Sequence, residues 1–205
     1  MSEKMLGPLL DRDLIQETIS TAMSKGGQWA EVFVEDRQSA SAEFDEGRVE
    51  SMVSSRDLGA GIRVTVGEAT GFAHTADLSL EGIRAAALAA AAAARGGNHI
   101  EPVALRGQGA SLNRAEILPS TVSKARKIEL TRQTDAAARE VDSAITQVSV
   151  RYSEGRRRIL VANSDGVFNG DDDPEKIRES GVVERASCAL LIFAGYHTQL
   201  DSLLA

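Results

Sequence analysis

The stretch LGAGIRVTVGEATGFAHT, residues 58–75, contains four glycines and ends beside one of the three histidines of this 205-residue chain. Apolar and polar residues alternate after Gly61, which is typical of a β-strand. A turn at residues 67–70 then leads into a second strand. The pattern predicts a β-hairpin that needs glycine for bulges or close packing. Its expected structural glycines are Gly59, Gly61, Gly67 and Gly71.

A phosphate-binding loop is the alternative interpretation of these glycines. Such a loop lies between a strand and the N-terminus of a helix, where free N–H groups meet the anion. Here more strand follows the glycines, the Lys-Ser/Thr pair of a P-loop is absent, and Val64 occupies the third glycine position of a GxGxxG pattern. The hairpin is therefore the favoured interpretation.

Outward from this hairpin, the chain alternates between helical and strand-like patterns. Helices are predicted over residues 11–25, 80–95 and 121–141. Single strands are predicted over residues 29–37 and 184–194, and a hairpin around Glu46-Gly47 is predicted over residues 39–55. Residues 144–168 are predicted to form two strands around Glu154-Gly155, followed by a turn at 163–166 and a shorter strand. Residues 96–119 carry two prolines and little periodicity, and are expected to form a long connector.

These elements predict an α+β fold, with a largely antiparallel (mixed) β-sheet built from hairpins and two long helices packed on it. The helix over 121–141 should begin at an N-cap of Ser120 or Thr121. The strand over 184–194 is continuously apolar from Ala189, which predicts cover on both faces. The expected buried stripe of helix 121–141 consists of Val122, Ala125, Ile128, Ala136, Ala137 and Val141.

Composition restricts the partners of this protein. The net charge is −7 and the pI is about 5.1, which argues against nucleic acid because counterion displacement needs clustered cations. No apolar run is long enough to span a membrane, and the N-terminus lacks the pattern of a secretory signal. Cys188 is the single cysteine, so no internal disulfide can form. A cytoplasmic protein that binds neither nucleic acid nor membrane is expected.

Nucleophiles and metal ligands are few in the sequence. His74, His99, His197 and Cys188 show no HExxH, no CxxC and no pair at metal-ligand spacing. The histidines are expected at the surface, and Cys188 is expected to be a buried, inert thiol. We therefore predict no catalytic residue and no metal ligand in this chain.

Three groups of charged residues in the sequence are expected to form solvated surface. Glu31, Glu35, Glu43 and Glu50 are expected to face water rather than to act as an acid–base pair. The run 156–158 of three arginines is expected to be a solvated turn rather than a phosphate site. The run 171–173 of three aspartates lacks the glycine and glutamate of an EF-hand and is expected to be an exposed loop.

The order of motifs resembles a known family. AEVFVEDR (30–37) is followed by SAEFDEGRVESMVSSRDLGAGIRVTVGEATGFAHTADLS (41–79) and later by DAAAREVDSAITQVSVRYSEGRRRILVANSDGVF (135–168). Together these resemble the N-terminal domain of the TldD/PmbA family, the TldD branch more than the PmbA branch, over about residues 12–170. Each motif alone is weak, but their order is specific.

This resemblance implies that the chain corresponds to the N-terminal domain of a zinc metallopeptidase, of a kind historically labelled a modulator of DNA gyrase. Full-length members are two-part proteins whose zinc site, a His-Glu-x-x-x-His motif with a further cysteine, lies in the second domain. The present sequence contains no His-Glu pair, and Cys188 does not correspond to the ligand cysteine. The resemblance therefore implies no cofactor in this chain, with zinc expected only in the absent catalytic domain, and predicts that the chain alone is inactive.

The resemblance also implies partners and a domain boundary. Family members form homodimers or TldD–PmbA heterodimers that enclose the active site and admit unfolded peptides. Residues 1–173 are expected to be the N-terminal domain, which shapes the substrate enclosure and the subunit interface. Residues 174–205 match less well and are expected to hold a final strand and a tail.

Two further functions remain open at this point. The chain is either an excised fragment or a natural short protein, and in the second case it would be a binding or regulatory module that pairs with a complete family member. A hydrolase that uses Cys188 and a histidine is the least favoured possibility, because no neighbouring base can be placed from the sequence.

Overall fold

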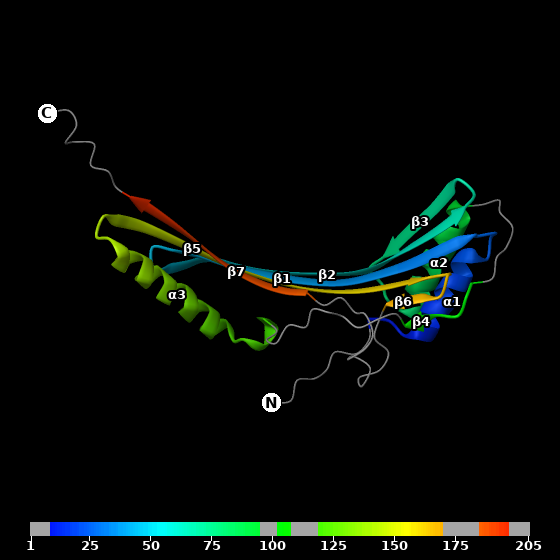
Figure 1. Cartoon of the computed structure of the whole chain (residues 1–205), viewed down its shortest axis with the longest axis horizontal. Helices are drawn as coiled ribbons and strands as arrows, with labels where there is room; N and C mark the ends of the chain where they lie inside the picture. The colour runs from blue at the N-terminus through cyan, green and yellow to red at the C-terminus, as the bar shows by residue number, and fades with distance from the viewer. Residues whose placement is uncertain (1–8, 95–101, 108–118, 170–184, 197–205) are drawn as a thin grey trace, which may run out of the picture. The chain divides into compact units, whose positions relative to one another are not determined.

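The computed structural model describes residues 9–94, 102–107 and 119–169, and the backbone of residues 185–196 (Figure 1). Three α-helices, one 3₁₀ turn and seven strands lie in these residues, which confirms the α+β class. In chain order they are α1 (Arg12–Met23), β1 (Trp29–Asp45), β2 (Arg48–Val66), β3 (Ala69–Thr75), α2 (Leu80–Ala93), β4 (Arg106–Gly107), the 3₁₀ turn (Pro119–Thr121), α3 (Lys124–Val141), β5 (Ile145–Asn163), β6 (Val167–Asn169) and β7 (Arg185–Tyr196).

The strands form one mixed sheet in the order β3-β2-β1-β5-β6-β4, and β7 also pairs with β5. The predicted hairpin is confirmed, because β2 and β3 pair antiparallel from Ala60 with Thr75 to Val66 with Ala69. The β5–β6 pair is antiparallel and the short β4–β6 pair is parallel. Most of the sheet is therefore antiparallel, as the sequence predicts.

Backbone contacts divide the chain into two compact units. Unit 1 contains residues 1–37, 57–114 and 157–185, and unit 2 contains residues 38–56, 115–156 and 186–205. The long strands β1, β2 and β5 each contribute one part to unit 1 and the other part to unit 2.

In unit 1, helices α1 and α2 cover one face of the sheet (Figure 1). Strand alternation places Val32 and Val34 of β1 and Ile62 and Val64 of β2 on this covered face, where all four are fully buried. The alanines of α2 allow a close approach to the sheet. Helix α2 begins at the predicted residue 80, and α1 begins one residue after the predicted residue 11. Asp11 is the N-cap of α1 and Ser79 that of α2.

Unit 2 contains a smaller core, formed by Phe44, Ile145, Val148 and Val150 with Ala138 of α3 packed against it. Two predictions for this helix are wrong. Its N-cap is Ser123, because the 3₁₀ turn over Pro119–Thr121 delays the start of the helix.

The predicted buried stripe of α3 is also wrong. The buried residues of α3 are Thr131 and Asp135, whereas Val141 is 76% exposed. Ala125, Ala136 and Ala137 are exposed, and Val122 and Ile128 are half-buried. The helix turns a polar face inward, and the buried Asp135 on that face forms an ion pair at 3.2 Å with Arg139, whose side chain is 35% exposed. Pattern analysis assigns apolar residues to the core and misses this case.

The predicted turn at Glu154-Gly155 is wrong, because β5 runs unbroken through these residues. A tight turn there would need a left-handed backbone, which the described structure shows at Gly47, Gly67 and Gly166 but not at Gly155. The turns around Glu46-Gly47 and at 163–166 are confirmed. The strand expected over 184–194 is confirmed as β7, while the cover of its faces and most of the connector 96–119 lie outside the described residues.

Candidate functional site

The nucleophiles and metal ligands named in the sequence do not come together in the described structure. His74 is exposed on β3, and the ring of Phe72 stacks beside it with centroids 6.2 Å apart. Cys188 lies on β7, whose side chains are outside the described part, as are His99 and His197. Within residues 9–94, 102–107 and 119–169, no three His, Cys, Asp or Glu side chains form a group that could hold a metal. These residues do not fit a zinc ion.

Three of the four hairpin glycines occupy positions where a side chain would meet the backbone or a ring. A Cβ on Gly71 would lie 2.1 Å from the carbonyl oxygen of Ala90 in α2, and one on Gly61 would lie 3.2 Å from Cε2 of Phe72. A Cβ on Gly59 would lie 2.9 Å from the carbonyl oxygen of Thr75. Gly67 has a φ of +57° in the turn between β2 and β3.

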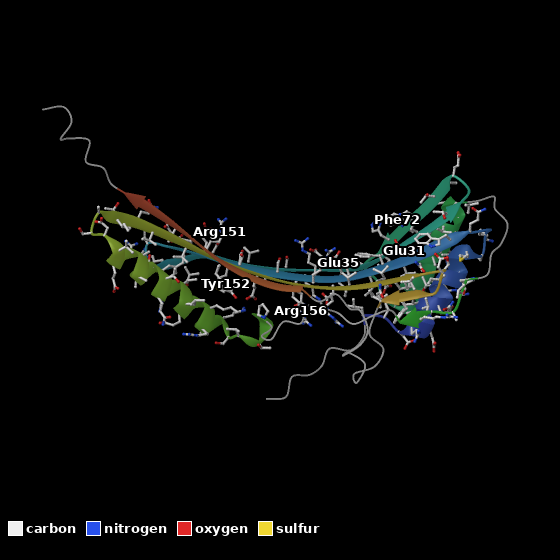
Figure 2. The ribbon with its side chains drawn as sticks, viewed as in Figure 1. Glu31, Glu35, Phe72, Arg151, Tyr152 and Arg156 are labelled. Atoms are coloured by element: carbon white, nitrogen blue, oxygen red, sulfur yellow. The ribbon has the colours of Figure 1, made fainter. Side chains whose placement is uncertain are left out.

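A shallow hollow of about 360 Å³ lies on the face of unit 1 that α1 and α2 leave uncovered. Gly59 and Gly61 line it together with Phe33, Phe72 and Glu35. Phe72 is 60% exposed, and Figure 2 shows Phe72 and Glu31 on the outer side of the sheet. Gly61 leaves room for the Phe72 ring to pack over it, and the exposed part of this ring suits contact with an extended chain or a flat apolar group.

The strand carboxylates are paired with arginines on neighbouring strands. Glu31 is 3.3 Å from Arg63 of β2, and Glu35 forms an ion pair with Arg157 of β5. Glu43 is 2.9 Å from Arg151 of β5, whereas Glu50 is exposed. Because the residue numbers of the partners on β5 decrease as the residue numbers on β1 increase, β1 and β5 run antiparallel. These separate pairs supply no acid–base couple.

The arginine triplet does not form a solvated turn, because it lies inside β5. Alternation along the strand separates its members: Arg157 is exposed and pairs with Glu35, while Arg158 is only 7% exposed. Arg156 points to the same side as Tyr152 (Figure 2). The aspartate run 171–173 lies outside the described residues.

A larger groove of about 590 Å³ lies in unit 2 between the sheet and the start of α3. Its lining includes Arg56 of β2, Lys124 and Lys127 of α3, and Glu154 and Arg156 of β5. Sequence reasoning missed this groove. The available signal was the set of three cations at 124, 126 and 127, which pattern analysis counts only as helix surface.

One buried cluster fixes the floor of this groove. Lys127 Nζ lies 2.6 Å from Glu154 Oε2, and the two side chains are 13% and 12% exposed. The Tyr152 hydroxyl donates a 2.5 Å hydrogen bond to the same carboxylate oxygen. The Lys127 ammonium also lies 5.9 Å from the centroid of the Tyr152 ring. Helix and strand are thereby joined by charge and hydrogen bonding.

The helices in the described part of the chain are all too short or too polar to cross a membrane.

Two family models match the chain in order. Residues 30–94 match the model described as PmbA/TldA metallopeptidase domain 1, and residues 117–175 match the PmbA/TldA metallopeptidase central domain. A curated relative, the metalloprotease TldD homolog of Haemophilus influenzae, is 29% identical over 170 residues. The match covers 78% of this chain and 35% of the relative, so the chain spans about a third of that protein.

Solved structures show the same fold at low identity. A protein described as a modulator of DNA gyrase from Bacteroides thetaiotaomicron superposes with a TM-score of 0.64 at 15% identity, covering 91% of this chain and 41% of that one. A protein of similar description from Thermotoga maritima superposes with a TM-score of 0.62 at 14% identity, covering 89% of this chain and 38% of that one. TldE from Thermococcus kodakarensis superposes with a TM-score of 0.59 at 14% identity, covering 90% of this chain and 40% of that one.

Proposed function

We propose that this chain, which belongs to the PmbA/TldD metallopeptidase family, is the non-catalytic front part of a zinc metallopeptidase. In this role, it shapes the enclosure through which unfolded peptides reach the active site. The observation that carries this proposal is the ordered match of the chain to the first and central domains of the family. The expected domain boundary at residue 173 stays a prediction.

The strand carboxylates favour a structural role. Glu31, Glu35 and Glu43 are each engaged in an ion pair with an arginine of a neighbouring strand. Zinc and the water that it activates would come from a part of the protein beyond the matched domains. The residues of this chain would then bind, orient and enclose the peptide.

The hollow of unit 1 supports a role in contacting peptide. The ring of Phe72, which packs over Gly61 and is 60% exposed, supplies apolar contact area at little entropic cost. Contacts of this kind do not depend on the identity of peptide side chains, so they suit a protein that takes unfolded substrates. A cytoplasmic location and assembly as a homodimer or a TldD–PmbA-type heterodimer belong to the same proposal.

The intact mass of the endogenous protein tests the proposal. A mass well above 21.8 kDa, with the additional sequence carrying His-Glu-x-x-x-His, is the expected result. A mass of 21.8 kDa would contradict it. That outcome would support instead a regulatory module that pairs with a complete family member, and copurification with such a member would identify it.

The role of the hollow needs a separate measurement in the natural protein. Phe72→Ala should raise KM for an unfolded peptide and leave kcat for a short peptide unchanged, because Phe72 contacts substrate away from the reacting bond. Val53→Ala, at an exposed apolar residue on β2 in unit 2, is the matched control. Equal kinetics for both variants would contradict a peptide-contacting hollow.

A further inference from the structure

The hollow of unit 1 places two aromatic rings and an exposed carboxylate on the same side of the sheet. Strand alternation puts Asp57 on the face of β2 that carries Gly59 and Gly61. Phe33 of β1 lines the same hollow, and antiparallel pairing with β2 brings Phe72 of β3 to that side as well (Figure 2). The hollow therefore combines apolar ring surface with one acidic group.

The carboxylate of Asp57 is available to a ligand. It forms no hydrogen bond and no ion pair with any other residue that the structure describes. The second carboxylate of the hollow, Glu35, is instead paired with Arg157. Arg37 follows on the same side of β1 and makes no ion pair with Asp57 in the described part of the chain. Because the described lining contains neither lysine nor arginine, the hollow itself supplies no cation to Asp57.

The same side of the sheet carries a complete version of this arrangement. Arg63 lies 5.1 Å from the centroid of the Trp29 ring and 3.3 Å from the carboxylate of Glu31. Ring, carboxylate and cation thus meet within one protein chain. Among the described residues, no cation lies over the ring of Phe33 or of Phe72. The hollow has the ring and the carboxylate and lacks the third member of this group.

A lysine or arginine side chain has the chemistry that completes it. Such a side chain lays its apolar stem along apolar surface and keeps the cationic group at its end beside polar or charged groups. A cation near an aromatic face is also attracted by the ring. Gly59 and Asp57 are two residues apart on one face of a strand, about 7 Å, which leaves room for an extended stem between the rings and the carboxylate.

The form of the hollow favours a side chain of a long polymer over a free small molecule. Sites for small molecules enclose most of the ligand surface. This hollow, of about 360 Å³, is shallow and lies on an uncovered sheet face. One side chain of an extended polypeptide can enter it while the rest of the polypeptide stays outside.

We propose that the hollow of unit 1 binds lysine and arginine side chains of unfolded polypeptides. Asp57 accepts hydrogen bonds from the cationic group, and the rings of Phe33 and Phe72 contact its stem. The choice of a polypeptide rests on the proposed function, whereas the preference for a cation rests on the residues of the hollow alone. The protein would thereby favour basic segments of its substrates at a place separate from bond cleavage.

An NMR titration of the full 205-residue chain tests this proposal without any peptidase activity. The probe is the peptide AGSKSGA with blocked termini, so that its lysine carries the only charge. The control is the same peptide with Nε-acetyllysine, which keeps the stem and removes the charge. The lysine peptide should bind at least about fivefold more tightly, because an ion pair and a ring contact act together. Its shifts should centre on the backbone amides of Gly59, Gly61 and His74.

Variants separate the two contacts. Asp57→Asn should weaken binding of the lysine peptide about threefold or more and leave the acetyllysine peptide unchanged, because it removes the charge of the acceptor. Asp13→Asn, at an exposed carboxylate in the first turn of α1, is the matched control and should change neither. Phe72→Ala should weaken both peptides, because both carry the apolar stem. The spectrum of each variant shows whether it is folded.

Three results would overturn the proposal. Equal affinity for the lysine and acetyllysine peptides would show that the cation is not recognised. Equal losses in Asp57→Asn and Asp13→Asn would show attraction to the acidic surface in general. Displacement of the lysine peptide by an equimolar concentration of ethylammonium, which lacks the stem, would show a general cation site in place of a polypeptide site.

Failure of this proposal can be told apart from failure of the proposed function. Equal binding of the two peptides, together with a raised KM in Phe72→Ala, would reject the cation site and keep the peptide-contacting hollow. Binding of the lysine peptide at the hollow of a natural protein of only 21.8 kDa would retain the cation site and reject the proposed function.

Discussion

Gly71 of β3 lies directly against Ala90 of α2, so closely that a Cβ built on the glycine would come 2.1 Å from the alanine carbonyl oxygen. The same Cβ would lie 2.8 Å from the backbone nitrogen of Ala94. Both neighbours are backbone atoms of a helix end, which cannot move aside as a flexible side chain can. This contact sets the distance between α2 and the hairpin.

Gly71→Ala should therefore destabilise the protein by about 3 kcal/mol, at the upper end of overpacking costs. Gly67→Ala is the matched control in the same hairpin. It meets open space and bears only the cost of a left-handed backbone at φ +57°, about 1 kcal/mol. Urea unfolding of both variants gives the comparison. A smaller loss in Gly71→Ala than in Gly67→Ala would contradict the close packing of β3 on α2.

Lys127→Met should destabilise unit 2 by about 1–3 kcal/mol, because the Glu154 side chain, 12% exposed, would lose its ion pair and retain the hydrogen bond from the Tyr152 hydroxyl. Lys124→Met, an exposed residue one turn earlier, should cost no more than about 0.5 kcal/mol. Urea denaturation measures both. Adding Glu154→Gln to Lys127→Met should recover part of the loss, and a strictly additive double variant would contradict the coupling.

Asp77 should make the protein more stable above pH 4 than below it. The backbone N–H of Ser79 donates a 2.9 Å hydrogen bond to its carboxylate, and this bond, with the one from the Ser79 side chain, lowers the pKa of Asp77 below the ordinary 3.8. Because the folded pKa lies below the unfolded one, the stabilisation is fully present above pH 3.8. It is lost as the pH falls through the folded pKa.

The stability difference between the wild type and Asp77→Asn should therefore shrink between pH 6 and pH 3. Urea unfolding at both pH values measures it, with Asp57→Asn on the exposed part of β2 as the control substitution. An NMR titration of the Asp77 carboxyl carbon gives the pKa directly. A midpoint at or above 3.8 would show that the Ser79 hydrogen bonds do not form in solution.

The purified 205-residue chain should contain no stoichiometric zinc and should hydrolyse no unfolded peptide. The sequence lacks a His-Glu pair, and the described residues group no three metal-ligating side chains. Metal analysis after gel filtration without chelator measures zinc, and a fluorogenic casein assay measures hydrolysis. One tightly held zinc per chain would contradict the assignment of the metal to another part of the protein.

The sequence predicted those features that depend on local pattern. The turn at Glu46-Gly47 and the hairpin over residues 58–75 follow from glycine and alternation, and the helices near residues 11–25 and 80–95 follow from helical spacing and alanine content. Features that depend on distant partners were missed. The unbroken path of β5 through Glu154-Gly155 is one of them, because a glycine alone does not show whether a neighbouring strand continues beside it.

The candidate sites were harder to predict than the fold. The buried position of Asp135 depends on its ion pair with Arg139 and on the packing of α3. The groove brings Arg56 together with Lys124 and Arg156, which lie 68 and 100 positions later in the sequence. Such clusters arise only when strands and helix are packed. The resemblance identified the family of the chain, but no local motif pointed to the hollow or to the groove.

The sharing of β1, β2 and β5 between the two units has a consequence for how this protein is made. Neither unit is a continuous piece of polypeptide, so no single cut in the gene yields one of them intact. The bond between Ala30 and Ser164 joins residues 134 positions apart, and a chain must close a loop of that length before its first strand is paired on both sides. Folding should accordingly be slow, and the pairing of β1 with β5 should form only after residue 164 has left the ribosome.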